Sequence, residues 1–365
     1  MITYDEFGPE KILAIYNPKT KMKGFLVIDN TARGPAKGGI RITPTVSAEE
    51  VYRLARVMTW KTALADLPFG GGKAGIVAGK MDESQKKTFI EDFAKELKPF
   101  CPSHYVSAPD VNTGEKEMGW FAKANGSMKA CTGKPKEMGG IPHELGSTGW
   151  GVYHSTLIAL KFAGLDPKKT KVAIEGFGNV GMFTAKFLSE QANIRVAAVS
   201  DSKGTIYNQN GLVFSRLKEV KEKSGSVTAY PNSQVLKNEQ LFDLPVDVII
   251  PAALPDSINQ NNVDKIKAKV IVEAGNIAMT EEMENKLHSK GVLVVPDFVA
   301  NAGGVISSYI EYIGKSEKEV FPLIEKKIKE NTQVVLDHAE RDNLKPRDAA
   351  LEIAKERVRK AMQKR

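Results

Sequence analysis

Hydrophobic and polar positions follow different patterns in the two halves of the chain. From about Lys171 onward, short apolar runs rich in β-branched residues alternate with helical patterns; the runs are KVAIEGFG, RVAAVSD, VDVIIPAA, KVIVEAGN and GVLVVPD. Continuous apolar strands separated by helices predict a parallel, doubly wound sheet that is covered on both faces. A helix from about Thr148, with Val152 and Leu160 on its apolar stripe, leads into this half and is expected to end at Gly164.

The first half of the chain is less regular. The run GFLVIDN predicts a strand, and Ser47 with Glu50 forms a capping-box pattern at the start of a helix. The apolar stripe of that helix extends from Val51 to Met58, and continuing its rhythm places Lys61 on the same face. A lysine there either extends to the edge of the packed face or projects from it into a cleft.

The change of pattern predicts an α/β protein of two domains. We expect the first domain to cover residues 1–147 and to be joined by a C-terminal helix at about 335–365, and a Rossmann-type domain to cover 148–334. The segment from Phe321 carries two amphipathic helical patterns, and its basic end, VRKAMQKR, is expected to be a solvated helix end.

Composition narrows the function classes. The 365 residues are 42% hydrophobic and carry a net charge of +8, but the basic residues are interspersed with acids, which argues against nucleic-acid binding. No apolar run is long enough to span a membrane, and the acidic start differs from a secretion signal. Two cysteines without C-x-x-C spacing and histidines without ligand spacing predict a cytoplasmic protein with no metal site.

The first strand of the second half runs into a glycine-rich turn. The pattern G-x-G-x-x-G follows a strand, precedes a helix and has an acid, Asp201, about 20 residues later, which together predict dinucleotide binding. In this pattern the glycines form the turn, admit the pyrophosphate and let the helix approach the strand. The residues expected to bind cofactor in this turn are Gly176, Phe177, Gly178, Asn179, Val180 and Gly181.

Small residues and amides stand at the ends of the later strands, where open α/β sheets bind ligands. The cofactor-binding residues expected there are Ala252, Ala253, Asn276 and Asn301, the two asparagines as hydrogen-bond partners of a nicotinamide ribose or carboxamide. Asp201 favours NAD through the adenosine ribose, whereas Lys203 in the same turn favours the 2′-phosphate of NADP. We therefore expect NADP or dual use of the two coenzymes.

Three lysines precede the nucleotide domain, each in a distinctive setting. They are Lys37 in PAKGGIR, Lys61 in MTWKTAL and Lys73 in GGGKAGI. The glycines around Lys73 suit either an exposed turn with a solvated lysine or a place where backbone packs closely around the amine. Two further motifs are APDVNT, which contains Asp110, and NAGGVISSY near the end of the chain. Together with the lysine motifs, they make the sequence resemble the superfamily of glutamate, leucine, phenylalanine and valine dehydrogenases, and the resemblance extends over nearly the whole chain.

The resemblance implies roles for these residues. In that family the first domain binds substrate and makes most subunit contacts, the second binds NAD or NADP, and the reaction takes place in the cleft between them. Lys73 resembles the catalytic lysine, Asp110 the proton-transferring carboxylate and Lys61 the lysine that holds the substrate α-carboxylate. Lys37 and Ser308 resemble the pair that binds the distal carboxylate in glutamate enzymes. The positions that match the side-chain pocket are Ala108, Thr148 and Val305.

Glutamate dehydrogenase is therefore the expected activity, with L-glutamate, 2-oxoglutarate and ammonium as substrates and products. Two rival functions are a leucine- or valine-type dehydrogenase, which Lys37 and Ser308 disfavour, and a catalytically silent nucleotide-binding protein, which Lys73 and Asp110 disfavour. The segment GGIPHELGSTGWG departs from the usual glutamate-enzyme pattern, and the length is closer to the leucine enzymes. We expect a homo-oligomer, with a hexamer favoured over an octamer or dimer.

Overall fold

The computed structural model describes residues 2–142 and 145–364, which divide into two compact units. Unit 1 comprises residues 1–145, 305–320 and 351–365, and unit 2 comprises residues 146–304 and 321–350. The division near residue 146 lies close to the boundary expected from the pattern. The C-terminal part differs from the expected division. Residues 305–320 belong to unit 1, although they were expected in the second domain, and residues 335–350 belong to unit 2, although they were expected with the first.

Unit 1 is built on a mixed sheet ordered β1-β2-β5-β3-β6, with β4 also pairing with β5. The expected GFLVIDN strand lies within β2, and the glycine-rich lysine segment forms β5, which pairs with β2, β3 and β4. The strands are β1 (Lys11–Tyr16), β2 (Lys23–Asn30), β3 (Ala36–Lys37), β4 (Ile40–Thr43), β5 (Gly70–Val77) and β6 (Tyr105–Val106).

Besides its sheet and an apolar core that includes Leu26, Phe93 and Phe121, unit 1 contains helices. They are α1 (Ala48–Leu64), α2 (Glu83–Glu96), α3 (Glu115–Asn125), α9 (Gly303–Tyr312) and the greater part of α11 (Pro346–Met362). The two cysteines, Cys101 and Cys131, are free and buried in this core. Short 3-10 helices occur at Met128–Ala130, Lys136–Met138, Val227–Ala229, Asn238–Asp243 and Glu317–Glu319.

Helix α1 differs from its sequence pattern in the partner of Glu50 and in the side of the helix that is buried. Ser47 caps it as expected, but the Glu50 carboxylate accepts a hydrogen bond from Arg41. Val51, the first residue of the expected stripe, is fully buried, but Met58 and Lys61 are only partly buried, and the buried side continues instead through Ala55 and Thr59. The reason is the glycines of β5, which bring the side of α1 that carries small residues closest to the sheet.

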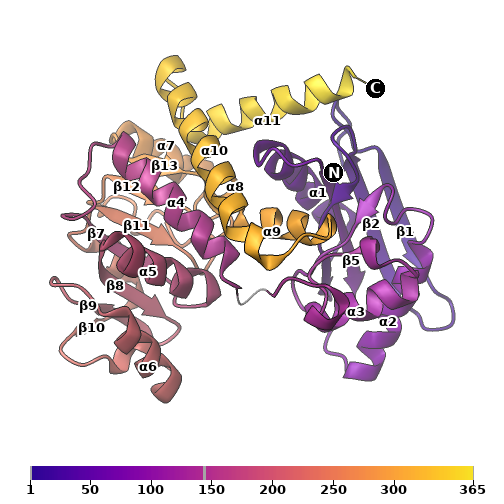
Figure 1. The fold of residues 1–365 in the computed structure, drawn as a ribbon, viewed down its shortest axis with the longest axis horizontal. Helices are drawn as coiled ribbons and strands as arrows, with labels where there is room; N and C mark the ends of the chain where they lie inside the picture. Colours follow the sequence, from indigo (N-terminus) through magenta and orange to yellow (C-terminus); the bar gives the residue numbers. More distant parts are fainter. Residues whose placement is uncertain (1, 143–144, 365) are drawn as a thin grey trace. The chain divides into compact units, whose positions relative to one another are not determined.

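Unit 2 is built on a sheet ordered β10-β9-β8-β7-β11-β12-β13, in which neighbours from β8 to β13 are parallel (Figure 1). The five apolar runs form the strands β7 (Lys171–Glu175), β8 (Arg195–Asp201), β11 (Val248–Pro251), β12 (Val270–Val272) and β13 (Leu293–Val295). The sequence pattern missed β9 (Gly204–Tyr207) and β10 (Gln234–Leu236), which extend the sheet in antiparallel orientation. These strands are short and lack a continuous apolar run.

The helices of unit 2 cover a core that includes Ala173, Ile249, Ile271 and Leu287. They are α4 (Ser147–Phe162), α5 (Asn179–Ala192), α6 (Phe214–Ser224), α7 (Glu281–Ser289), α8 (Asp297–Ala300) and α10 (Val320–Asp342). Gly164, in a left-handed conformation with φ 65°, follows α4 as expected. No helix among the described residues is long and apolar enough to cross a membrane.

Candidate active site

Lys73 lies in the middle of β5, and its side chain is buried. The residue is only 7% exposed, so the alternative of a solvated lysine at a turn is wrong. A Cβ on Gly71 would come within 2.1 Å of the Thr59 nitrogen in α1, and one on Gly38 within 1.7 Å of the Gly72 carbonyl oxygen. Backbone segments therefore approach Lys73 more closely than any side chain would permit.

The amine of Lys73 forms an ion pair with Asp110. The Nζ atom lies 2.9 Å from Asp110 Oδ2, which also accepts a hydrogen bond from Arg41 Nε at 3.0 Å. Burial lowers the pKa of Lys73, and the Asp110 charge offsets only part of that effect. Burial works to raise the pKa of Asp110, but the charges and hydrogen bonds of Lys73 and Arg41 outweigh it and lower the pKa. The pair is suited to passing a proton between an amine and a carboxylate.

The loop that carries Asp110 is fixed to β4. The Asp110 N–H donates to Thr113 Oγ1 at 2.8 Å, and that hydroxyl donates to the Ile40 carbonyl, also at 2.8 Å. Asn112 adopts a left-handed conformation and donates from its side chain to the Ile42 carbonyl. The carboxylate is therefore positioned by a strand of the same sheet that holds Lys73.

Lys37 is a second buried amine, and its surroundings differ from those of Lys73. It is 1% exposed and donates from Nζ to the Ser107 carbonyl oxygen at 2.7 Å. Within residues 2–142 and 145–364, no carboxylate lies in ion-pair contact with this amine. Burial lowers the pKa of Lys37 to about 7, and the nearby charge of Glu311 works against this shift. Lys37 is thus a buried basic group that still lacks a carboxylate partner.

The expected pocket residues of unit 1 lie on two segments of that unit. Ala108 adjoins Ser107, whose carbonyl binds Lys37, and Val305 and Ser308 lie on α9. All three are partly buried. Thr148, in contrast, lies on α4 of unit 2, where it faces Gly304: a Cβ on that glycine would lie 3.1 Å from Thr148 Oγ1.

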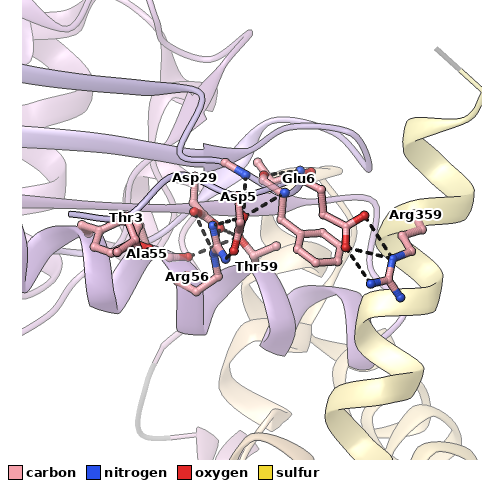
Figure 2. A network of polar contacts seen from close by, with 12 residues as sticks. Thr3, Asp5, Glu6, Asp29, Ala55, Arg56, Thr59 and Arg359 are labelled. Atoms are coloured by element: carbon pink, nitrogen blue, oxygen red, sulfur yellow. Dashed lines mark hydrogen bonds and ion pairs between the residues drawn. The ribbon is translucent and has the colours of Figure 1, made fainter. Parts of the chain in front are cut away.

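A network of polar contacts holds helix α1, which carries Lys61, against β2 (Figure 2). Arg56 donates from Nε to both oxygens of the fully buried Asp29, each at 2.9 Å, and from its other nitrogens to Asp5. The Thr59 hydroxyl also donates to Asp29. These contacts set the register of α1 on the sheet, so they also place Lys61, half-buried in the last turn.

In unit 2 the glycine-rich turn has the geometry that a dinucleotide needs. Gly176 has φ 94°, and a Cβ on Gly181 would lie 1.9 Å from the Gly176 carbonyl oxygen, so helix α5 begins directly against the turn. Gly178 precedes α5, is exposed and has no atom within 4 Å of the position of a Cβ. The N-terminus of α5 is therefore open to a negatively charged group, and the residues present fit a pyrophosphate.

The strand-end alanines are fixed to the same turn. The N–H groups of Ala252 and Ala253 donate to Glu175 Oε2 at 3.2 and 3.1 Å. A Cβ on Gly176 would lie 2.6 Å from the Cβ of Ala253. The loop after β11 therefore packs directly on the turn that begins after β7.

Asp201 is more fully occupied than its sequence position suggests. Its carboxylate accepts hydrogen bonds from Lys221 Nζ at 2.7 Å, Val227 N at 2.8 Å, Lys203 N at 2.9 Å and Ser226 Oγ at 3.1 Å. The Lys221 amine also donates to the Gly225 carbonyl, and a Cβ on Gly225 would lie 3.8 Å from Lys203 Nζ. Two lysine amines thus lie around one turn, beside a carboxylate whose charge is already neutralised.

The structure brings the two expected asparagines together. Asn301, which is buried, donates from Nδ2 to Asn276 Oδ1 at 2.9 Å and to the Ala274 carbonyl at 3.3 Å. Asn276 is exposed at the carboxyl end of β12. Its amide is therefore held in one orientation and remains accessible.

Sequence reasoning missed three groups. Arg41 forms ion pairs with both Asp110 and Glu50. The alternation of apolar and polar residues in the short run IRIT could have indicated the strand that carries it. Lys134 and Glu311 form a buried ion pair at 2.5 Å close to Lys37. Arg347 forms ion pairs in unit 2 with Glu273, Glu284 and Asp297. No local sequence pattern predicts these contacts.

Comparisons with known proteins identify the family of the chain. A model of the Glutamate/Leucine/Phenylalanine/Valine dehydrogenase family matches residues 139–365, and one of the Glu/Leu/Phe/Val dehydrogenase dimerisation domain matches 10–126. The chain is 40% identical over 357 residues to a glutamate dehydrogenase of Thermotoga maritima, covering 94% of this chain and 86% of the relative. It is also 40% identical over 360 residues to one of Aeropyrum pernix, covering 92% and 85%.

Solved structures give the same result. A glutamate dehydrogenase of Peptoniphilus asaccharolyticus superposes with a TM-score of 0.86 at 30% identity and covers 97% of this chain and 91% of that one. A hetero-hexameric glutamate dehydrogenase of Thermus thermophilus, with leucine bound, superposes with a TM-score of 0.84 at 29% identity, covering 97% and 89%. The chain belongs to the Glutamate/Leucine/Phenylalanine/Valine dehydrogenase family and is an NAD(P)-dependent amino-acid dehydrogenase.

Proposed function

We propose that the protein catalyses the reversible oxidative deamination of L-glutamate to 2-oxoglutarate and ammonia. The observation that carries this proposal is Lys37, a buried amine with a carbonyl as its partner, in the same compact unit as the Lys73–Asp110 pair. Burying the distal carboxylate of glutamate without a counter-charge costs several kcal/mol, so a pocket for it requires a fixed cation. An apolar amino acid has no use for that cation.

The residues of unit 1 have distinct roles in this reaction. Lys61 holds the α-carboxylate, and Lys37 with the Ser308 hydroxyl holds the distal carboxylate. The glycine-rich turn of unit 2 would hold NAD(P)⁺, which would supply the hydride acceptor for oxidation of the α-carbon to an imine. Lys73, in its neutral form, removes a proton from the water that attacks the imine carbon, and Asp110 exchanges that proton with Lys73. The protonated amine of Lys73 then donates its proton to the nitrogen of the carbinolamine and takes up the hydroxyl proton as ammonia leaves and 2-oxoglutarate forms.

The surroundings of Lys73 support this assignment. Its lowered pKa increases the fraction of neutral amine that can act as a base near neutral pH. The ion pair with Asp110 gives the proton a second site at hydrogen-bond distance. Arg41, on the other side of Asp110, favours the ionised form of this carboxyl group, so a proton taken up by Asp110 is returned to the amine.

For the coenzyme we propose use of NADP as well as NAD. Four donors occupy Asp201, so its charge is compensated, and the amines of Lys203 and Lys221 lie around the same turn. Two relatives, of Saccharolobus shibatae and Halobacterium salinarum, carry the name NADP-specific glutamate dehydrogenase. For the assembly we propose a homo-oligomer, with a hexamer favoured.

The test is a spectrophotometric screen of NADH and NADPH formation with a panel of amino acids. Glutamate is expected to give the highest kcat/KM, and Lys73→Ala is expected to abolish most of that activity. Lys80→Ala, which removes an exposed lysine just beyond β5, is the matched control and should retain it. Preference for leucine or valine would contradict the substrate, and full activity of Lys73→Ala would contradict the mechanism.

A further inference from the structure

The loop after β12 contains a residue in an unfavourable backbone conformation. Ile277 has φ 55°, in the left-handed region that glycine and asparagine tolerate and that β-branched residues avoid. Its side chain is nevertheless 55% exposed, so burial of the isoleucine does not compensate for the strain. Strained residues of this kind persist where surrounding structure holds them, and they gather at functional sites.

Hydrogen bonds on both sides of Ile277 hold it in this conformation. Its N–H donates to Asp297 Oδ2 at 3.0 Å, and its carbonyl accepts from the Asp256 N–H at 2.9 Å. Asp256 belongs to the loop after β11, and Asp297 is the first residue of α8. Two neighbouring segments of unit 2 therefore hold the two peptide units that flank the Cα atom of Ile277.

The contact with Asp297 is itself anchored. Arg347 donates to Asp297 Oδ1 at 3.2 Å and also bonds Glu273, the residue that follows β12 and begins this loop. The Asp297 N–H donates to Glu273 Oε2 at 2.9 Å. One arginine thus joins the start of the loop to the carboxylate that fixes Ile277.

The position of the loop in the sheet indicates what it faces. The order β8-β7-β11-β12 puts the pyrophosphate turn of β7 between Asp201, at the end of β8, and Ile277, beyond the end of β12. A dinucleotide bound across this edge has its adenosine on the β8 side, so its nicotinamide lies on the β11–β12 side. Leu254, 67% exposed in the loop after β11, adds a second apolar side chain to that half.

We propose that Ile277 makes an apolar contact with the nicotinamide ring of the bound coenzyme, and that the strained loop serves to present it. The proposal rests on the coenzyme binding described above and adds a residue to it. The exposed amide of Asn276 precedes Ile277, so a polar group for the carboxamide and an apolar group for the ring stand side by side in the chain. Asp297 acts as a positioning residue through the Ile277 N–H.

The test compares ligands with and without nicotinamide. Dissociation constants of NADPH and of 2′-phospho-ADP-ribose, which lacks the ring, are measured by calorimetry for the wild type, Ile277→Gly and Ile277→Leu. Glycine removes the side chain and the strain together, so the thermal midpoint of the free protein should not fall. Losing a half-buried isoleucine contact should raise the Kd of NADPH about fivefold or more and leave that of 2′-phospho-ADP-ribose unchanged. Ile277→Leu should bind NADPH nearly as tightly as the wild type.

Controls separate this proposal from the function on which it rests. Lys21→Gly relieves a left-handed residue (φ 63°) in unit 1 and should leave both dissociation constants unchanged. An unchanged NADPH affinity in Ile277→Gly would overturn the proposal, as would equal weakening of both ligands, because that would indicate a disrupted loop. A wild type that bound neither ligand would instead contradict the coenzyme assignment.

Discussion

Both units bury charged side chains, but they balance these charges in different ways. Unit 1 buries the amines of Lys37 and Lys73, whereas unit 2 buries Glu273 and Glu284 around Arg347. The acids of unit 2 share a cation of their own chain. In unit 1, Lys37 donates to a carbonyl oxygen and forms no ion pair with a carboxylate of the described residues. In the function proposed above, this difference distinguishes a buried charge that completes the fold from one that binds a substrate.

The acidic cluster is also where a proton is expected to remain bound at neutral pH. Burial raises the pKa of Glu273 to about 8, and the Arg347 charge opposes the rise. The Oε1 atoms of Glu273 and Glu284 are buried and make no hydrogen bond. Burial disfavours the charged form of Glu273, and Arg347 supplies a cation to the cluster from the same chain.

The largest expected effect concerns the catalytic amine. Replacing Lys73 by alanine removes the group that we propose activates water, and general acid–base catalysis of this kind contributes about 10²- to 10⁴-fold in rate. We expect kcat for glutamate to fall by that factor, while NADPH affinity stays within error of the wild type. Steady-state kinetics and calorimetry measure the two quantities. Loss of coenzyme binding together with activity would mean that the variant had misfolded.

Removing the arginine of unit 2 should primarily affect stability. Arg347→Met leaves three carboxylates without their cation, which typically costs about 3–5 kcal/mol in the free energy of unfolding. Glu273 has a folded pKa of about 8 against an ordinary 4.5, so stability falls as the pH rises between these values. The variant raises that pKa further, so its deficit should be larger at pH 9 than at pH 5. Denaturant unfolding at both pH values checks this, and an equal deficit would contradict it.

Substrate selection is expected to depend on Lys37. Lys37→Leu should lower kcat/KM for glutamate about 100-fold, mainly through KM, because the distal carboxylate loses its buried counter-charge. With Ser308→Val in addition, leucine or norleucine should become the better substrate. Stability should not fall, because an apolar side chain replaces a buried amine. An unchanged KM for glutamate would exclude the proposed role.

A smaller effect is expected at the coenzyme turn. Lys203→Ala removes an exposed amine near Gly225 and should raise KM for NADPH about 3- to 10-fold, the effect of losing one exposed phosphate contact. KM for NADH should change less than twofold. Lys218→Ala, an exposed lysine on α6, is the matched control. Equal changes for the two coenzymes would indicate that Lys203 does not contact the 2′-phosphate.

The sequence predicted the parts of the molecule that depend on local patterns. The strands from β7 to β13 with parallel neighbours were recognisable because each is a continuous apolar run, and Lys37, Lys73 and Asp110 because each lies in a distinctive motif. The contacts among Arg347, Glu273 and Asp297 could not be predicted from the sequence, because they join residues up to 74 positions apart and form only when the sheet forms. The strain at Ile277 was hidden for the same reason, since it depends on hydrogen bonds from two other loops.

The central claim is that the distal carboxylate of the substrate forms an ion pair with Lys37 and keeps this amine protonated. The pKa of this amine is about 7 without a ligand, and a bound carboxylate raises it, so binding 2-oxoglutarate at pH 8 should take up close to one proton. Calorimetry with saturating NADPH, in buffers that differ in ionisation enthalpy, measures this uptake. It should disappear in Lys37→Leu and with a 2-oxo acid that lacks the distal carboxylate. Equal uptake in all three cases would contradict the account.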